Sequence, residues 1–258
     1  MGNMNKKRVN LLTICIFSSV LWGCGTPVNE PVQDKTTVRA STSEHDIPRI
    51  ISKIEPIALK RPEICDAENC TKYQLQTVQT NVDWINQYFK TRIQEMAPEA
   101  FATGLTEPVK TQDVGLSQNS ISVRYLHQWG DIATFLIDTY SYNAGAAHGL
   151  YHLEYVNLDL ANHRRLSLND IIIQNSQAKL LQALYDANQF WLEQHQILPE
   201  QLQLSDNFYY GTQGIVFVYP LYELASYAEG LSELTLPYTD AKQFIQPKYL
   251  PDLPQSDL

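Results

Sequence analysis

Residues 121–137 read ISVRYLHQWGDIATFLI, and the fold expected for the whole chain follows from this stretch. Residues 121–125 and 133–137 are rich in β-branched and aromatic side chains, which favour β-strands. Gly130 and Asp131 lie between the two runs and are typical of a tight turn. The stretch therefore predicts an antiparallel hairpin, and residues 150–160 predict a further strand after it.

Two helical patterns flank this hairpin in the sequence. Apolar side chains recur at helical spacing from Val82 to Met96, Asn81 is in position to cap that helix, and Pro98 follows its end. A second helix is expected over residues 176–195, and the other expected strands are residues 50–59, 72–78, 207–210, 215–219 and 232–237. We therefore expect an α+β fold in which antiparallel sheets carry two main helices packed on one side.

The N-terminus has the pattern of an export signal. Lys6, Lys7 and Arg8 precede an apolar run over residues 9–22, which is short for a transmembrane helix. Residues 21–24 read LWGC and resemble a lipobox, so we expect cleavage before Cys24 and lipid on its thiol. A plain secretory signal, or an N-terminal anchor with an incidental cysteine, is the alternative. By resemblance to Gram-negative sorting patterns, Gly25 favours an outer-membrane lipoprotein that faces the periplasm, if the host is Gram-negative.

The charge of the chain restricts its partners. The formal net charge is −9, and removal of the signal takes away three cations and no acids, leaving 16 Lys and Arg against 28 Asp and Glu, or −12. Such an acidic domain has no electrostatic reason to bind nucleic acid and should attract cationic partners.

The cysteines have distinct expected fates. Cys15 leaves with the signal and Cys24 takes lipid, so Cys65 and Cys70 are expected to form a disulfide in an oxidising compartment. A loop this short adds only about 2 kcal/mol in the chain-entropy model, enough to fix a turn. A metal site would need more soft ligands than lie nearby. We expect no metal and no cofactor.

Composition and pattern together suggest five segments. Residues 25–46 are too poor in apolar side chains to build a core. The expected segments are a signal peptide at residues 1–23, a flexible tether at 24–49, an N-terminal segment at 50–117, a main domain at 118–250 and a loose tail at 251–258.

Motifs for catalysis are scarce. His148, in the small-residue stretch AGAAHG at residues 144–149, is a candidate general base or ligand contact, or else it satisfies local backbone groups. His148 and His152 cannot share a metal on one strand, because side chains four residues apart are separated by about 13 Å. The chain has no GxSxG, P-loop or GxGxxG pattern. Carboxylates such as Asp138, Glu154 and Asp159 are interpreted as solvated strand residues, and no catalytic residue is predicted.

Tyrosine, with 15 copies, is in excess and concentrated in the later half. Tyrosine provides rigid amphipathic surface for interfaces or for stacking on sugars, although strand tyrosines also fill half-buried sheets. The binding residues that we single out are Tyr140, Tyr142, His148, Tyr219 and Tyr222.

Several blocks together resemble the RsiV-like domain family. They read YSYNAGAAHG at residues 140–149, YVNLDL at 155–160, LSLND at 166–170 and VFVYPLYELA at 216–225. The earlier strand and helix are similar to the PdaC-like segment that often precedes such a domain. The resemblance implies a non-enzymatic exported domain, of the kind found in a lysozyme-binding anti-sigma factor and as an accessory part of a peptidoglycan deacetylase.

These observations predict a membrane-anchored lipoprotein that acts as a non-enzymatic binding module of the cell envelope. Its ligand would be lysozyme, another cationic protein or peptidoglycan. The alternatives are an envelope enzyme acting on peptidoglycan or another glycan through His148 or a nearby carboxylate, an accessory domain of such an enzyme, and a purely structural lipoprotein.

Overall fold

The computed structural model describes residues 47–65, 69–102 and 115–251. The predicted signal peptide, Cys24, most of the tether and most of the tail lie outside these residues. Within them, every helix is too short or too polar to cross a membrane.

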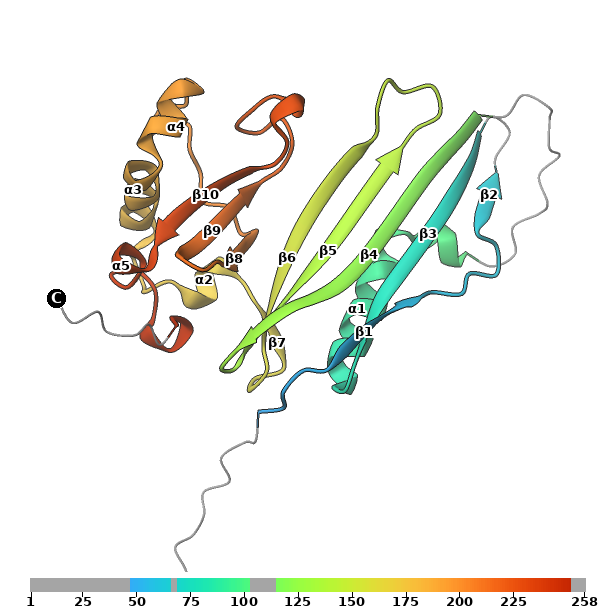
Figure 1. Cartoon of the computed structure of the whole chain (residues 1–258), viewed down its shortest axis with the longest axis horizontal. Helices are drawn as coiled ribbons and strands as arrows, with labels where there is room; N and C mark the ends of the chain where they lie inside the picture. The colour runs from blue at the N-terminus through green and yellow to red at the C-terminus, as the bar shows by residue number, and fades with distance from the viewer. Residues whose placement is uncertain (1–46, 66–68, 103–114, 252–258) are drawn as a thin grey trace, which may run out of the picture. The chain divides into compact units, whose positions relative to one another are not determined.

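The described chain contains two β-sheets (Figure 1). The larger sheet has the order β1-β3-β4-β5-β6-β7, with β2 also paired to β3, and the smaller has the order β10-β9-β8. The strands are β1 (Ser52–Pro56), β2 (Glu63–Cys65), β3 (Asn69–Thr80), β4 (Gly115–Trp129), β5 (Ile132–Tyr142), β6 (Leu150–Asp159), β7 (Arg164–Leu166), β8 (Phe208–Tyr210), β9 (Gly214–Tyr219) and β10 (Ser232–Pro237). The α+β prediction is confirmed.

The predicted central hairpin forms the middle of the larger sheet. β4 and β5 pair antiparallel around a turn in which Gly130 has a φ of 51°, and β6 pairs antiparallel with β5. β3 and β4, in contrast, pair in parallel. A parallel pair requires a long crossover, which here includes the helix α1 (Asp83–Met96) and the 3-10 turn η1 (Pro98–Phe101).

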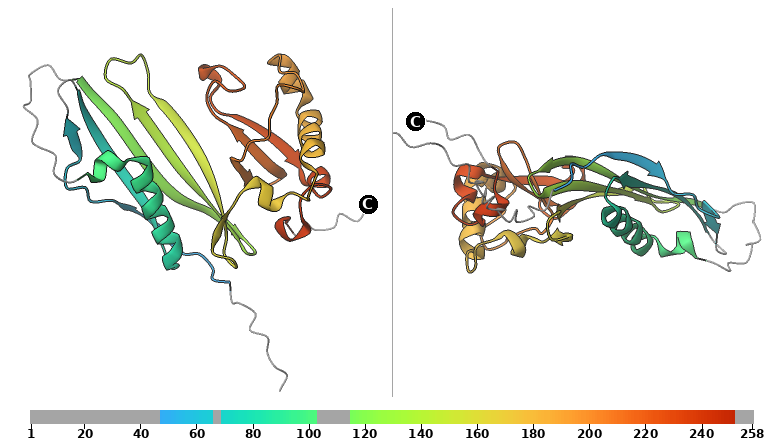
Figure 2. Two further views of the ribbon diagram at one scale, coloured as in Figure 1. Left: turned by 180° about the vertical axis from the view of Figure 1, so that it is seen from behind. Right: turned by 90° about the horizontal axis from the view of Figure 1, so that it is seen from below.

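Helix α1 covers one face of the larger sheet, as Figure 2 shows. Its buried side chains are Ile85, Phe89 and Ile93, so the predicted apolar stripe is confirmed. The predicted cap is wrong: Val82 occupies the N-cap position, and the Asn81 side chain instead bonds the backbone N–H of Ile51 and the carbonyl of Arg49.

The second predicted helix is interrupted. It consists of α3 (Gln177–Ala187) and α4 (Gln189–Gln194), preceded by the short α2 (Leu168–Ile171). The break is at Asn188, because its side chain donates to Leu184 O and also exchanges hydrogen bonds with the backbone of Thr235 on the edge strand β10. The remaining helical elements are η2 (Tyr227–Glu229), α5 (Tyr238–Ala241) and η3 (Pro247–Tyr249).

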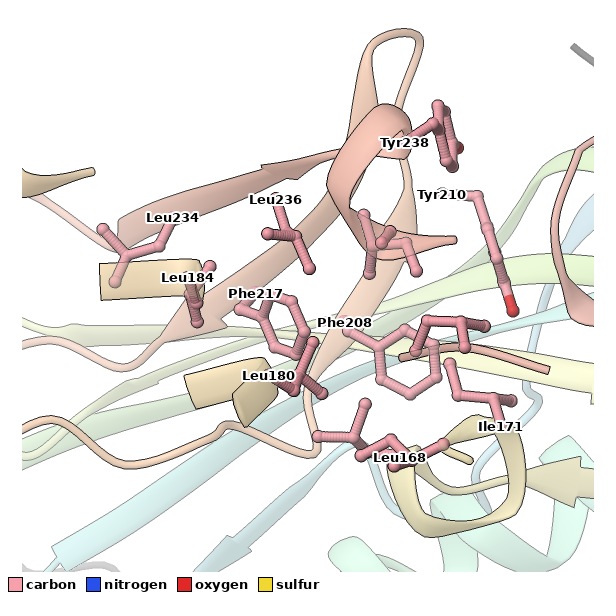
Figure 3. Packing of buried hydrophobic residues seen from close by; sticks show 14 of the residues in the cluster. Leu168, Ile171, Leu180, Leu184, Phe208, Tyr210, Phe217, Leu234, Leu236 and Tyr238 are labelled. Atoms are coloured by element: carbon pink, nitrogen blue, oxygen red, sulfur yellow. The ribbon is translucent and has the colours of Figure 1, made fainter. Parts of the chain in front are cut away.

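Two groups of buried side chains form the core. One lies between α1 and the larger sheet, and the other lies between α2, α3, α5 and the smaller sheet. Figure 3 shows the second group, where Leu180 and Leu184 of α3 pack near Phe217 of β9. The predicted boundary between residues 117 and 118 falls inside β4, so the larger sheet runs across it.

Two asparagines connect the sheets. Asn157 on β6 is 1% exposed, accepts from the Thr134 hydroxyl at 2.9 Å and donates to Phe208 O on β8 at 2.7 Å. Asn207, just before β8, donates to Leu153 O and accepts from Tyr155 N on β6. Buried amides with both ends paired favour one arrangement of the elements that they join.

The predicted disulfide is confirmed, because Cys65 and Cys70 are bonded at an S–S distance of 2.00 Å. They are also register partners in the antiparallel pair of β2 and β3.

Candidate functional site

An aromatic cluster lies where two loops meet, and we define it as His148, Tyr222 and Tyr227. His148 comes from the turn between β5 and β6, and the two tyrosines come from the loop between β9 and β10. Tyr227 stacks on His148 with ring centroids 4.0 Å apart and on Tyr222 with centroids 5.7 Å apart. The cluster is therefore a row of three rings with Tyr227 in the middle.

Gly149 fixes the first loop against the second. Its carbonyl accepts hydrogen bonds from the Tyr227 hydroxyl at 2.9 Å and from His148 Nδ1 at 3.0 Å. The Tyr140 ring packs against Gly149 so closely that a Cβ there would overlap it. A glycine is required at this position because the backbone approaches a ring, which is one of the uses of a residue without a side chain.

The second loop is held by a hydrogen-bonded turn around Glu229. The Glu229 carboxylate accepts from the Ser226 hydroxyl and backbone N–H in a capping box, and Gly230 follows with a φ of 84°. His195 Nε2 donates to the same carboxylate at 2.6 Å, while its Nδ1 faces Trp191 O at 2.8 Å. Because both ring nitrogens of His195 face hydrogen-bond acceptors, the protonated imidazolium, which donates from both nitrogens, matches these partners.

The charges of this turn follow from these contacts. The hydrogen bond to Glu229, with that to Trp191 O second, raises the pKa of His195 above its usual value. The hydrogen bond from His195, followed by those from Ser226, lowers the pKa of Glu229. Trp191 also stacks on His195 with ring centroids 3.8 Å apart. Because His195 lies at the end of α4, its charged pair with Glu229 connects α4 to the loop between β9 and β10.

Tyr222 is the most exposed ring of the cluster. Its relative exposure is 58%, and its backbone is in the left-handed region with a φ of 68°. Bulky side chains adopt this conformation rarely, at a cost of about 1–2 kcal/mol. The loop therefore presents Tyr222 in one strained orientation, supported on one side by Tyr227.

The other predicted binding residues are distributed differently. Tyr140 is 36% exposed and packs on Gly149, beside the cluster. Tyr142 ends β5 opposite Gln118 and shares no ring contact with the cluster. Tyr219 is only 1% exposed and its hydroxyl donates to Gln203 O at 2.7 Å. Tyr219 is a core residue, and we leave it out of the site.

Sequence reasoning missed the central ring. Tyr227 was one tyrosine among many in the sequence, and nothing marked it as the partner of His148. The SYAE pattern at residues 226–229 was a usable signal, because Ser followed three residues later by Glu indicates a capping box.

The candidate base His148 and the acids Glu154 and Asp159 have separate hydrogen-bond or ion-pair partners. Within residues 47–65, 69–102 and 115–251, no carboxylate bonds to His148, whose Nδ1 faces its neighbour's carbonyl. Glu154 is paired to Arg92 and Arg165, and Asp159 is buried and accepts from Asn162. The interpretation of these two acids as solvated strand residues was wrong, because the Glu154 side chain is 12% exposed and Asp159 is 4% exposed.

One group of acid and sulfur ligands lies elsewhere. Glu63, Cys65 and Cys70 come within 4.8 Å of one another, but the two cysteines are bonded to each other. A cysteine binds a metal as its thiolate, and a disulfide contains no thiolate.

The fold is that of a two-sheet α+β protein seen before in crystal structures. One is a DUF3298 family protein from Pseudomonas aeruginosa PAO1, with 18% identity and a TM-score of 0.60 over 80% of this chain and 99% of that one. Another is a member of the same family from Bacteroides fragilis NCTC 9343, with 16% identity and a TM-score of 0.52 over 76% of this chain and 94% of that one. At these identities the likeness concerns the fold alone.

Residues 166–239 match the model of the DUF3298 family, whose description is "Protein of unknown function". The matched part includes Tyr222, Tyr227 and His195, whereas His148 lies before it. A comparison with curated proteins found no match. The finer resemblance to RsiV-like and PdaC-like domains stays a prediction.

Proposed function

We propose that this protein is an exported lipoprotein, anchored through lipid on Cys24, and that it acts as a non-enzymatic binding module of the cell envelope. The aromatic cluster is the contact surface, and a cationic protein such as lysozyme is the ligand. The RsiV-like resemblance of the sequence motivates the choice of lysozyme as the first ligand to test.

The exposure of Tyr222 is the observation that carries this proposal. A tyrosine that is 58% exposed gains little from folding, yet its ring is stacked on Tyr227, which is itself bonded to Gly149. Rigid, exposed tyrosines lose little conformational entropy on binding and are frequent among the residues that dominate interface energies.

Charge supports a cationic partner. The chain without its signal has a formal charge of −12, and the exposed Glu223 follows Tyr222 directly. Opposite charge across an interface raises the association rate and is weakened by salt.

The proposed binding module is not an enzyme, and the contacts of His148 support this part of the proposal. Its ring stacks on Tyr227 and its Nδ1 faces Gly149 O, so within the described residues it has neither an acid to orient it nor a nucleophile to activate. Such an arrangement suits a ring held in place for contact.

Binding to hen egg-white lysozyme tests the ligand. We expect saturable binding of the purified full-length chain in detergent, weaker at 0.5 M than at 0.05 M NaCl. Tyr222→Ala should weaken binding about 30-fold, since truncating a dominant interface residue costs about 2 kcal/mol.

The matched control is Phe190→Ala, which removes a ring that is 76% exposed on α4 and has no partner ring among the described residues. It should bind lysozyme like the parent. No binding by the parent protein at either salt would remove lysozyme, and equal losses in the two variants would remove the cluster as the contact surface.

The anchor is tested separately. In cells that process lipoproteins, Cys24→Ser should abolish incorporation of radiolabelled palmitate and shift the protein from the membrane fraction to the soluble one. Retention of the label in this variant would contradict lipidation at Cys24.

A further inference from the structure

The parallel pair β3–β4 differs in charge from the rest of the chain. Residues 69–80 and 115–129 contain no Asp or Glu, although the whole chain has 28. Their cations are Lys72 and Arg124, and most of their other polar residues are amides and hydroxyls. An acidic protein thus carries two adjacent strands of its larger sheet without a carboxylate, and we call this pair of strands the strip.

The polar side chains of this strip share the face opposite α1. Tyr73 and Leu75 of β3 and Ile121 of β4 are buried with the helix, so the alternate residues point the other way. The strand register then places side by side Lys72 with Gln118, Gln74 with Ser120, and Gln76 with Ser122. Figure 2 shows α1 on the covered face of this sheet.

The strip is hollowed at its surface. Lys72, Gln74, Gln118, Asn119, Ser120 and Tyr140 line a small hollow of about 110 Å³. A larger hollow of about 520 Å³ shares Gln74 and Ser120 and continues past Gln76 and Ser122 to an apolar wall that includes Ile57 and Leu59. The two hollows adjoin, so together they form an elongated depression over β3 and β4.

The groups that line the smaller hollow are available to a ligand. Within the described residues, the side chains of Gln74, Gln118 and Ser120 make no hydrogen bond to protein, and Lys72 makes no ion pair. Gln76 and Ser122 bond to each other at 3.3 Å in the adjoining hollow. Each free amide offers both a donor and an acceptor.

We propose that this depression, which we call the amide strip and define by Lys72, Gln74, Gln118, Ser120 and Tyr140, binds a glycan of N-acetylated amino sugars. Adjacent hydroxyl and acetamido groups match side-chain amides, and a tyrosine ring gives a sugar an apolar surface to lie on. Carboxylates carried by such a glycan would meet Lys72 and no acid of the strip.

Other classes of ligand fit less well. Nucleic acid affinity depends on several phosphate contacts from Lys and Arg, and the strip has one cation at its hollow. A peptide that adds as a strand needs a free sheet edge, whereas β3 and β4 both have neighbours on each side. A ligand of the strip must therefore be recognised by side chains and not by free backbone groups. Sugars can be recognised in this way, because their hydroxyl groups bond to side-chain amides.

The amide strip is independent of the proposed lysozyme contact. It contains no residue of the aromatic cluster, and Tyr140 is the residue that lies between the two, with its ring against Gly149. Glycan binding at the strip can therefore hold or fail separately from protein binding at Tyr222.

Calorimetric titration of the full-length protein with chitohexaose, a β-1,4-linked hexamer of N-acetylglucosamine, tests the inference. We expect saturable binding, at least tenfold weaker in the double variant Gln74→Ala/Gln118→Ala, since each lost hydrogen bond weakens binding several-fold. The control Gln243→Ala removes an exposed amide after α5 and should bind like the parent. Maltohexaose, which lacks acetamido groups, should bind at least tenfold more weakly than chitohexaose.

Three results would overturn the proposal: no binding of chitohexaose by the parent, equal affinity of the double variant and the control, or equal affinity for maltohexaose. If the double variant does not fold, the nearly isosteric Gln118→Glu takes its place and should show the same loss. Tyr222→Ala should bind chitohexaose normally, and a loss of chitohexaose binding in that variant would assign the glycan to the aromatic cluster instead.

Discussion

Replacing Asn157 tests how the two sheets are joined. In Asn157→Ala the Thr134 hydroxyl loses its acceptor and Phe208 O loses its donor, and both residues are at most 1% exposed. A buried polar group left unpaired costs about 1–3 kcal/mol. Two such groups lead us to expect that Asn157→Ala lowers the free energy of unfolding by roughly 2–6 kcal/mol, which is a large share of the stability of an ordinary domain.

Asn207→Ala should be milder. Its two hydrogen bonds to the β6 backbone are half-buried, so water can replace part of what is lost. Two net hydrogen bonds at about 1 kcal/mol each give a loss of about 2 kcal/mol.

Urea unfolding followed by tryptophan fluorescence and far-UV circular dichroism measures both effects. Trp84 lies on α1 and Trp191 on α4, so fluorescence reports on the surroundings of both sheets. Asn169→Ala, an exposed position of α2, is the control and should stay within about 0.5 kcal/mol of the parent. If Asn157→Ala unfolds at the same urea concentration as this control, the asparagine bridges do not hold the sheets together.

Three further predictions concern single contacts. Tyr210→Phe should raise the free energy of unfolding by about 1 kcal/mol, because the buried Tyr210 hydroxyl has no hydrogen-bond partner among the described residues. Tyr219→Phe should lower it by about 1 kcal/mol, because the Tyr219 hydroxyl donates to Gln203 O. Thermal unfolding of the two variants and the parent measures both effects. Glu154→Gln should lower the free energy of unfolding by about 1–3 kcal/mol, with a smaller effect at high salt, because the carboxylate is 12% exposed and pairs two arginines. The pair of His195 and Glu229 should stabilise the loop most between about pH 5 and 6. The pKa of His195 is raised in the folded protein, so the contribution of His195 is lost as the pH rises through this raised pKa. The pKa of Glu229 is lowered, so the contribution of Glu229 is lost as the pH falls through this lowered pKa. Urea unfolding from pH 4 to 9 should show this maximum in the parent, and a His195→Gln curve of the same shape would contradict it.

The parts of the fold that could be predicted are those with local periodicity. Strand alternation and helical spacing were enough for the β4–β5 hairpin and for the buried stripe of α1, since both depend on residues close in sequence. The parallel pairing of β3 with β4 could not be predicted in this way, because it depends on how a long connection returns to the sheet. The break between α3 and α4 at Asn188 could not be predicted for a similar reason. The Asn188 side chain bonds to the backbone of Thr235, which is distant in sequence.

The candidate site shows the same limit. Tyr219 could have been assigned to the core, because it closes a strand that is apolar along its whole length and therefore buried on both faces. Tyr227 could not have been matched to His148 from sequence, because their contact depends on two loops of different sheets. The polar groups that join those sheets, Asn157 and Asn207, are buried amides whose partners no local pattern indicates.

The backbone of Tyr222 argues for a role beyond folding. The other described non-glycine residues with positive φ are His163, Asn175 and Gln196, which are polar residues in turns or at helix ends. A strained tyrosine costs about 1–2 kcal/mol, and a ring that is 58% exposed recovers about 0.5–1.5 kcal/mol by stacking on Tyr227. Folding alone therefore gains little or nothing from this side chain in this conformation. Strain of this kind is concentrated at binding and active sites, where a partner supplies the stabilisation that the free protein lacks. Since a glycine would adopt the same backbone without strain, a tyrosine at position 222 agrees with the contact that we propose between its ring and a partner.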